Sequence, residues 1–163
     1  MTKSALLVSS PAFKAGERIP KRHAYTGEGE NVSPAIAWSG APASTKEFAL
    51  LCDDPDAPTP EPWVHWVVYR IPPNVASLPE NVPMEDKELK NPKGAMQGTN
   101  SWRKLGWGGP MPPPGHGTHH YHFKVYALDA NLTLNPAATK AELLKAMSNL
   151  ILAEGDLVGT YSR

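Results

Sequence analysis

Three segments of the chain combine apolar, aromatic and β-branched residues in the way that is typical of strands. They are residues 47–53 (EFALLCD), 63–71 (WVHWVVYRI) and 119–129 (HHYHFKVYALD). Four prolines lie between the first two segments, and Pro72 and Pro73 follow the second. The pattern therefore predicts three buried strands, and the short connection makes the first two neighbours in one sheet.

Helical spacing of apolar residues appears in one place, near the C-terminus. Thr139 and Glu142 have the spacing of a capping box, which predicts that a helix begins there. The apolar residues that follow at helical spacing are Leu143, Leu144, Met147, Leu150 and Ile151. We expect Gly155 to end this helix and a short strand over residues 156–162 to close the chain.

The remaining segments are rich in turn residues. The first forty residues indicate short strands separated by glycine and proline, and residues 75–93 are polar and irregular. Residues 94–117 form a long loop punctuated by glycine and proline, and loops of this length tend to be functional. Thirteen glycines and 18 prolines in 163 residues are too many for a helical bundle and favour a mainly β fold.

Size and charge narrow the class of protein. A chain of 163 residues and 17.7 kDa is expected to form a single domain over residues 1–163. Sixteen basic and 16 acidic residues argue against nucleic acid or an anionic membrane surface as the partner. No apolar run approaches the roughly 20 residues of a membrane span, and Cys52 alone forms no intrachain disulfide. We therefore expect a cytoplasmic protein.

Histidine is the candidate chemistry that stands out, because four of the six histidines lie between residues 116 and 122. Strand alternation places His119 on the apolar face with Tyr121. It places His120 and His122 on the other face. His119 and His65 each lie on a predicted core strand beside an unusual loop, so they are candidate site residues. A structural role is the simpler interpretation for His23, His120 and His122.

Two loops carry further candidate chemistry. Residues 54–58 (DPDAP) place two carboxylates around Pro55, which holds Asp54 in an extended conformation. The alternative is an ordinary turn with solvated aspartates. Residues 106–115 (GWGGPMPPPG) allow backbone amides to approach an anion closely, although a surface loop is again the alternative. The glycine-rich nucleotide-binding motifs G-x-x-x-x-G-K-[ST] and G-x-G-x-x-G are both missing from the sequence.

Taken together, these segments and several others resemble the phosphatidylethanolamine-binding protein (PEBP) family, in its bacterial and archaeal Raf kinase inhibitor-like branch. The matching pieces are residues 30–34 (ENVSP), 38–40 (WSG), 54–58 (DPDAP), Trp63, His65, 109–113 (GPMPP), 119–121 (HHY) and 159–161 (GTY). They occur in the family's order and cover nearly the whole chain. Two departures are His120, where the family usually has arginine, and residues 148–150 (SNL), where relatives often carry a Gly-His pair.

The resemblance implies a large central antiparallel sheet packed against a smaller one, with one C-terminal helix and few others. It also implies a small cavity that takes phosphate, sulfate, acetate or a phosphoethanolamine head group. The residues that would bind the ligand are Asp54, Asp56, Pro58, Trp63, His65, Gly109, Pro112, His119 and Tyr121. Family members often have a cis bond before the second proline of the aspartate motif, here Ala57–Pro58.

The function implied is non-catalytic binding, with no cofactor and no metal. One alternative is a protein-interaction module, because relatives inhibit kinases or serine proteases. Another is an acid–base or metal-dependent hydrolase that uses the same pocket. Against the hydrolase, no G-x-S-x-G motif is present, and neighbouring histidines on a strand point to opposite faces instead of toward one metal. The resemblance leaves both a monomer and a homodimer open.

Two aspartates beside an anion need a physical explanation, since carboxylates repel phosphate. Either an aspartate raises the pKa of His65 or His119 so that an imidazolium meets the anion, or it binds the ammonium of a head group. We favour the first role for Asp54 and leave Asp56 open. The hydroxyl of Tyr121 would donate to the ligand, and the Trp63 ring would form an apolar wall or stack on an ammonium. Anion affinity should then rise as the pH falls through about 6 to 7.

Overall fold

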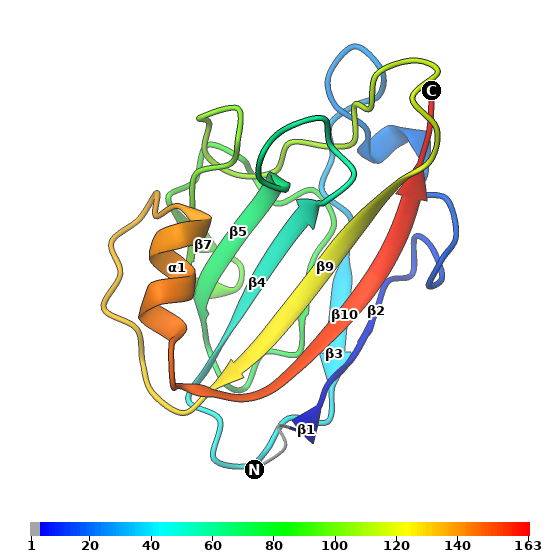
Figure 1. Cartoon of the computed structure of the whole chain (residues 1–163). Coiled ribbons are helices and arrows are strands. Elements are labelled where there is room, and N and C mark those ends of the chain that lie inside the picture. The colour runs from blue at the N-terminus through cyan, green and yellow to red at the C-terminus, as the bar shows by residue number, and fades with distance from the viewer. Residues whose placement is uncertain (1–3) are drawn as a thin grey trace.

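The structure is a computed structural model, and it describes residues 4–163. The strands are β1 (Ser4–Ala5), β2 (Leu7–Ser9), β3 (Ile36–Ser39), β4 (Glu47–Asp54), β5 (Trp63–Ile71), β6 (Ser77–Leu78), β7 (Glu88–Lys90), β8 (Lys93–Gln97), β9 (His119–Leu128) and β10 (Ile151–Tyr161). A short 3-10 helix, η1 (Lys21–His23), and an α-helix, α1 (Lys140–Met147), complete the described elements. Figure 1 shows how they are arranged.

The strands form two sheets within the described part of the chain. The large sheet has the order β1-β10-β9-β4-β5-β8-β7, and the small sheet has the order β2-β3-β6. Every pairing in the large sheet is antiparallel except that of β1 with β10, which is parallel. The structure therefore confirms a mainly β fold with a large and a small sheet. It corrects the expected antiparallel large sheet to a mixed one.

The strand β4 shows why the centre of the large sheet is so apolar. All eight of its residues are buried, because both faces of the sheet are covered. Phe48 and Leu50 pack in the core on the side of the small sheet, whereas Ala49 and Leu51 pack in a second core with α1. A strand covered on both faces has no polar alternation, which explains the continuous apolar run in the sequence.

The predicted helix begins where the sequence places it but ends early. Thr139 caps it, and its side chain and that of Glu142 make the reciprocal hydrogen bonds of a capping box. The helix ends at Met147, and Gly155 lies inside β10, so the expected helix end at Gly155 was wrong. The spacing misled because Ile151 belongs to the strand that pairs with β9. Glycine is needed at 155 because a Cβ there would lie 2.3 Å from the carbonyl oxygen of Leu6.

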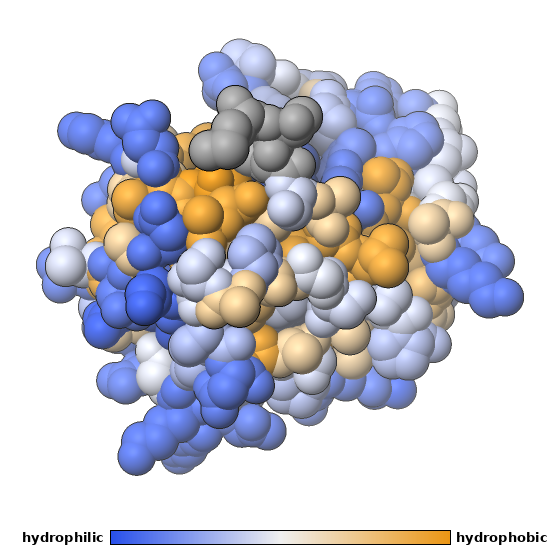
Figure 2. Space-filling view, turned by 90° about the horizontal axis from the view of Figure 1, so that it is seen from below, coloured by the Kyte–Doolittle hydropathy of each residue, from blue (hydrophilic) through white to orange (hydrophobic). Residues whose placement is uncertain are grey.

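Three central strands bring their ends to one side of the molecule. The strand β4 ends there, and its antiparallel neighbours β5 and β9 begin there. The loop that joins β4 to β5 and the loop that precedes β9 lie above these strand ends, at the top of Figure 1. The opposite end, seen in Figure 2, shows apolar side chains between polar ones. None of the helices within residues 4–163 is long and apolar enough to cross a membrane.

Candidate functional site

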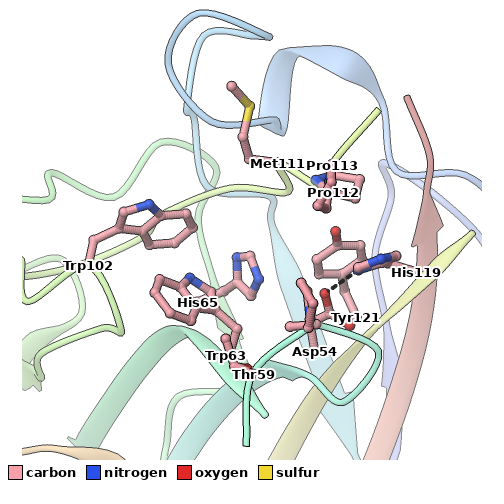
Figure 3. A pocket seen from close by; sticks show the side chains of 12 residues that line it. Asp54, Thr59, Trp63, His65, Trp102, Met111, Pro112, Pro113, His119 and Tyr121 are labelled. Atoms are coloured by element: carbon pink, nitrogen blue, oxygen red, sulfur yellow. Dashed lines mark hydrogen bonds and ion pairs between the residues drawn. The ribbon is translucent and has the colours of Figure 1, made fainter. Parts of the chain in front are cut away.

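A cavity of about 200 Å³ opens at the end of the large sheet where β4, β5 and β9 meet. Its walls come from these three strand ends, the proline-rich loop after β4 and the glycine- and proline-rich loop before β9 (Figure 3). The lining residues are Asp54, Ala57, Pro58, Thr59, Trp63, His65, Trp102, Met111, Pro112, Pro113, His119 and Tyr121. Seven of the nine predicted binding residues are among them, and Asp56 and Gly109 are not.

A buried polar contact in the cavity joins Asp54 to His119. Nδ1 of His119 lies 2.7 Å from Oδ2 of Asp54, and both side chains are less than 5% exposed. The other carboxylate oxygen of Asp54 accepts the amide of Asp56 at 2.8 Å. A carboxylate can only accept a hydrogen bond, so Nδ1 of His119 carries the proton that it donates to Asp54. This contact fixes the tautomer of a neutral His119.

His65 reaches the same cavity through an irregularity in β5. Cys52 pairs with Trp66 and Asp53 pairs with Val64, so His65 is the extra residue of a β-bulge. Its Nδ1 donates to the carbonyl oxygen of Gly108 at 2.6 Å. Burial lowers the pKa of His65 to about 4, although hydrogen bonding and the charge of Asp54 oppose this shift. His65 is therefore neutral near pH 7, and its Nε2 has a lone pair and no partner among the described residues.

Aromatic rings form the rest of the wall. The Tyr121 ring stands edge-on to His65 at a centroid distance of 5.0 Å, and burial and the charge of Asp54 raise the pKa of its hydroxyl. The hydroxyl of Tyr121 therefore stays protonated and is a donor to a ligand. Trp102, which sequence reasoning missed, meets Trp63 edge-on at 5.4 Å and stacks on Tyr25 at 4.4 Å. It lies in a loop, where no periodicity points to it.

Asp56 points away from the cavity. Its carboxylate accepts two hydrogen bonds from His120, one from the backbone amide and one from Nδ1, each at 2.8 Å. The side chains of both residues are about half exposed. The histidine that replaces the family's usual arginine therefore still makes an ion pair when protonated. This pair ties the loop after β4 to the start of β9.

Gly109 is buried outside the cavity lining, and its amide serves the fold. The amide donates to Oδ1 of Asn31 at 2.8 Å, and the amide of Gly108 donates to the carbonyl oxygen of His65 at 2.9 Å. A Cβ at Gly109 would lie 1.9 Å from the carbonyl oxygen of His23, so glycine is required for close packing. The amides of Gly108 and Gly109 are thus engaged in hydrogen bonds that hold the loop in place.

The other sequence expectations near the site have mixed outcomes. His23 is buried with its Nδ1 bonded to the carbonyl of Val32 at 2.7 Å, as a structural histidine should be. The cis peptide bond among the described residues is Asn91–Pro92, so the expected cis bond at Ala57–Pro58 was wrong. No three His, Cys, Asp or Glu side chains within residues 4–163 are arranged to hold a metal ion.

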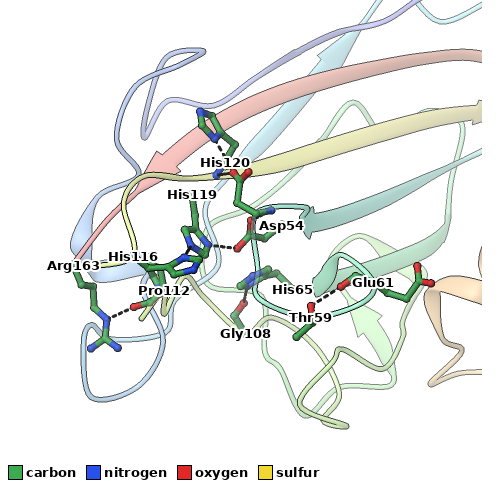
Figure 4. A network of polar contacts seen from close by, with 11 residues as sticks. Asp54, Thr59, Glu61, His65, Gly108, Pro112, His116, His119, His120 and Arg163 are labelled. Carbon is green, nitrogen blue, oxygen red and sulfur yellow. Dashed lines mark hydrogen bonds and ion pairs between the residues drawn. The ribbon is translucent and has the colours of Figure 1, made fainter. Parts of the chain in front are cut away.

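His116 lies beside the cavity and was not among the predicted binding residues. Its Nδ1 lies 2.6 Å from Nε2 of His119, as Figure 4 shows beside Pro112. The rings of His116 and His119 have centroids 4.9 Å apart. The result is a hydrogen-bonded chain from the exposed loop through His119 to the buried carboxylate of Asp54.

Comparison with known proteins adds a family likeness. A family model described as phosphatidylethanolamine-binding protein matches residues 9–162. A UPF0098 protein of Methanothermobacter thermautotrophicus is 47% identical over 152 residues, which are 93% of this chain and 95% of that protein. The crystal structure of Escherichia coli YbcL, described as a new member of the mammalian PEBP family, matches with a TM-score of 0.91 and 36% identity over 98% of this chain and 99% of YbcL. A PEBP homologue from Chlamydia trachomatis matches with a TM-score of 0.85 and 34% identity over 98% and 99%.

Proposed function

We propose that this chain, which belongs to the phosphatidylethanolamine-binding protein family, is a non-catalytic protein that binds a small anion of the phosphate or phosphoethanolamine type. The observation that carries the proposal is the buried pair of His119 and Asp54 in a cavity of about 200 Å³ that also holds a protonated tyrosine hydroxyl. We assign ligand contact to the seven predicted residues that line the cavity. Asp56 and Gly109 instead position the loops.

The protonation of the cavity determines which form of ligand it favours. A protonated His119 offsets the charge of Asp54 and attracts an anion, so affinity should rise as the pH falls. His65 is neutral and offers a lone pair at Nε2, so the ligand should bring a hydrogen-bond donor of its own. A phosphate monoester has such a donor when it is protonated below its second pKa of about 6. Sulfate has none.

Non-catalytic binding is supported by the absence of an activated nucleophile among the residues that line the cavity. The hydroxyl of Thr59 donates to the carbonyl oxygen of Glu61 at 2.6 Å, and no base lies beside it in the cavity lining. Cys52 is fully buried on β4, and burial raises the pKa of its thiol well above the usual range. A thiol of this kind is inert.

Titration calorimetry with inorganic phosphate and with sulfate, each at pH 5.5 and pH 8, tests the proposal. We expect phosphate to bind more tightly at pH 5.5 than at pH 8, and more tightly than sulfate at pH 5.5. Because sulfate does not titrate in this range, its own pH dependence reports on the protein alone. Equal affinities at both pH values for both anions would refute the assigned role of His119.

A pair of variants separates the cavity from the outer face of β9. His119→Ala should abolish phosphate binding, whereas His120→Ala should retain it, because His120 contacts Asp56 outside the cavity. Equal loss in both variants would contradict this assignment. Binding of a kinase or protease that is unaffected by His119→Ala would place the function on the surface instead of in the cavity.

A further inference from the structure

The ring of His116 is hydrogen-bonded to Nε2 of His119, the ring nitrogen that is not bonded to Asp54. His116 is exposed on the loop before β9, yet its Nδ1 lies 2.6 Å from Nε2 of the buried His119. The other ring nitrogen of His119 is bonded to Asp54 at 2.7 Å. While both contacts last, His119 has no nitrogen to offer to an anion. The ligand and His116 therefore compete for the same atom.

The 2.6 Å contact between His116 and His119 limits how many protons the two rings can carry. Two imidazole nitrogens 2.6 Å apart share one proton, since N–H groups on both would point at each other. Nδ1 of His119 also carries a proton, because Asp54 accepts there. The contact between His116 and His119 is therefore compatible with a pair charge of zero or plus one. It breaks when both rings carry two protons.

The loop around His116 has a fixed base and an open tip. Nε of Arg163 donates a hydrogen bond to the carbonyl oxygen of Pro112 at 2.7 Å. The amide of Gly115 donates a hydrogen bond to the carbonyl oxygen of Arg163 at 3.1 Å. Gly115 and Gly117 flank His116 with positive φ, and no atom lies within 4 Å of a Cβ built at either one. The amide of His116 itself donates to the carbonyl oxygen of Pro113 at 3.1 Å, so the backbone of His116 is held in a turn whose flanking glycines face open space.

We propose that His116 is a displaceable cover of the anion site. An anion binds by taking the place of His116 at Nε2 of His119, the ring nitrogen that Asp54 does not occupy. This inference rests on the proposed function and adds to it a residue that lowers the affinity of the site for its anion. His116 is a positioning residue in the unliganded protein, since it acts through His119.

A measurement without ligand tests the cover directly. Proton NMR of the wild type at pH 7.5 should show two downfield imidazole N–H signals from this chain, one between His116 and His119 and one between His119 and Asp54. The N–H groups of His23 and His65, bonded to backbone carbonyls, are distinguished by assignment. In His116→Ala the signal of the His116–His119 contact should be lost and that of the His119–Asp54 contact kept. If His116→Ala retains both signals, the two rings do not share a proton and the proposal is wrong.

Phosphate titration then tests competition. At pH 7.5, His116→Ala should bind inorganic phosphate about two- to tenfold more tightly than the wild type, the factor that one net hydrogen bond is worth. His122→Ala, whose ring pairs with Asp156 outside the cavity, is the matched control and should bind like the wild type.

The outcomes separate the cover from the proposed function. Weaker binding by His116→Ala would mean that His116 contacts the ligand, which overturns the cover. If phosphate binds neither the wild type nor the variant, the proposed function is refuted, and the NMR signals still decide whether His116 and His119 share a proton.

Discussion

The variant His65→Asn isolates the free energy with which burial opposes protonation of His65. The pKa of His65 is about 4 in the folded chain and about 6.5 in an unfolded one. Between these values the unfolded chain binds more protons, so the folded state loses stability as the pH falls below 6.5 toward 4. The full pKa difference corresponds to about 3 kcal/mol of folding free energy. About 2 kcal/mol of this stability is lost by pH 5.

Urea unfolding of the wild type and His65→Asn at pH 8 and pH 5 measures this difference. Asparagine keeps a donor near Nδ1 for the carbonyl of Gly108 but does not titrate. Between pH 8 and pH 5, the free energy of unfolding of the wild type should therefore fall by about 2 kcal/mol more than that of the variant. His122→Asn, on the other face of β9, controls for the exchange of histidine for asparagine. Equal losses in wild type and His65→Asn, or a smaller loss in the wild type, would refute the assignment of a neutral, buried His65.

Three further predictions concern the scaffold of the site. Gly109→Ala should destabilise the fold by about 1–3 kcal/mol or more, measured by urea unfolding, because its Cβ would overlap the carbonyl of His23; an unchanged midpoint would contradict the packing described. Thr139→Ala should cost about 1 kcal/mol and lower the melting temperature by about 2–4 °C, since it removes the cap that Glu142 completes; no change would mean that the capping box contributes little. Cys52 should react with a thiol reagent only after unfolding, and rapid labelling of the native protein would contradict its burial.

Strand alternation was enough to predict the face of β9 that carries the site. His119 and Tyr121 are buried and His120 is exposed, as a two-residue period requires. Alternation alone does not explain His65, because a β-bulge at that residue re-aims the side chain toward the cavity. The bulge depends on how β5 pairs with β4, and that pairing is not visible in the local sequence.

The loops account for most of what sequence reasoning missed or misplaced. Asp56 resembles Asp54 in the sequence, but it turns outward because the start of β9 offers it two donors from His120. Trp102 lines the cavity and His116 contacts His119, and both lie in loops, where no period fixes the direction of a side chain. Such contacts depend on how distant segments return over the sheet, which only the folded chain reveals.

The central claim is that small anions bind in the cavity between β4, β5 and β9. Chemical-shift mapping with inorganic phosphate at pH 5.5 tests it most directly. We expect saturable shifts for the signals of His65, His119 and Tyr121, and none for Tyr126 on the other face of β9. Shifts confined to the outer face, or no saturable shift at His119 and Tyr121, would contradict the account.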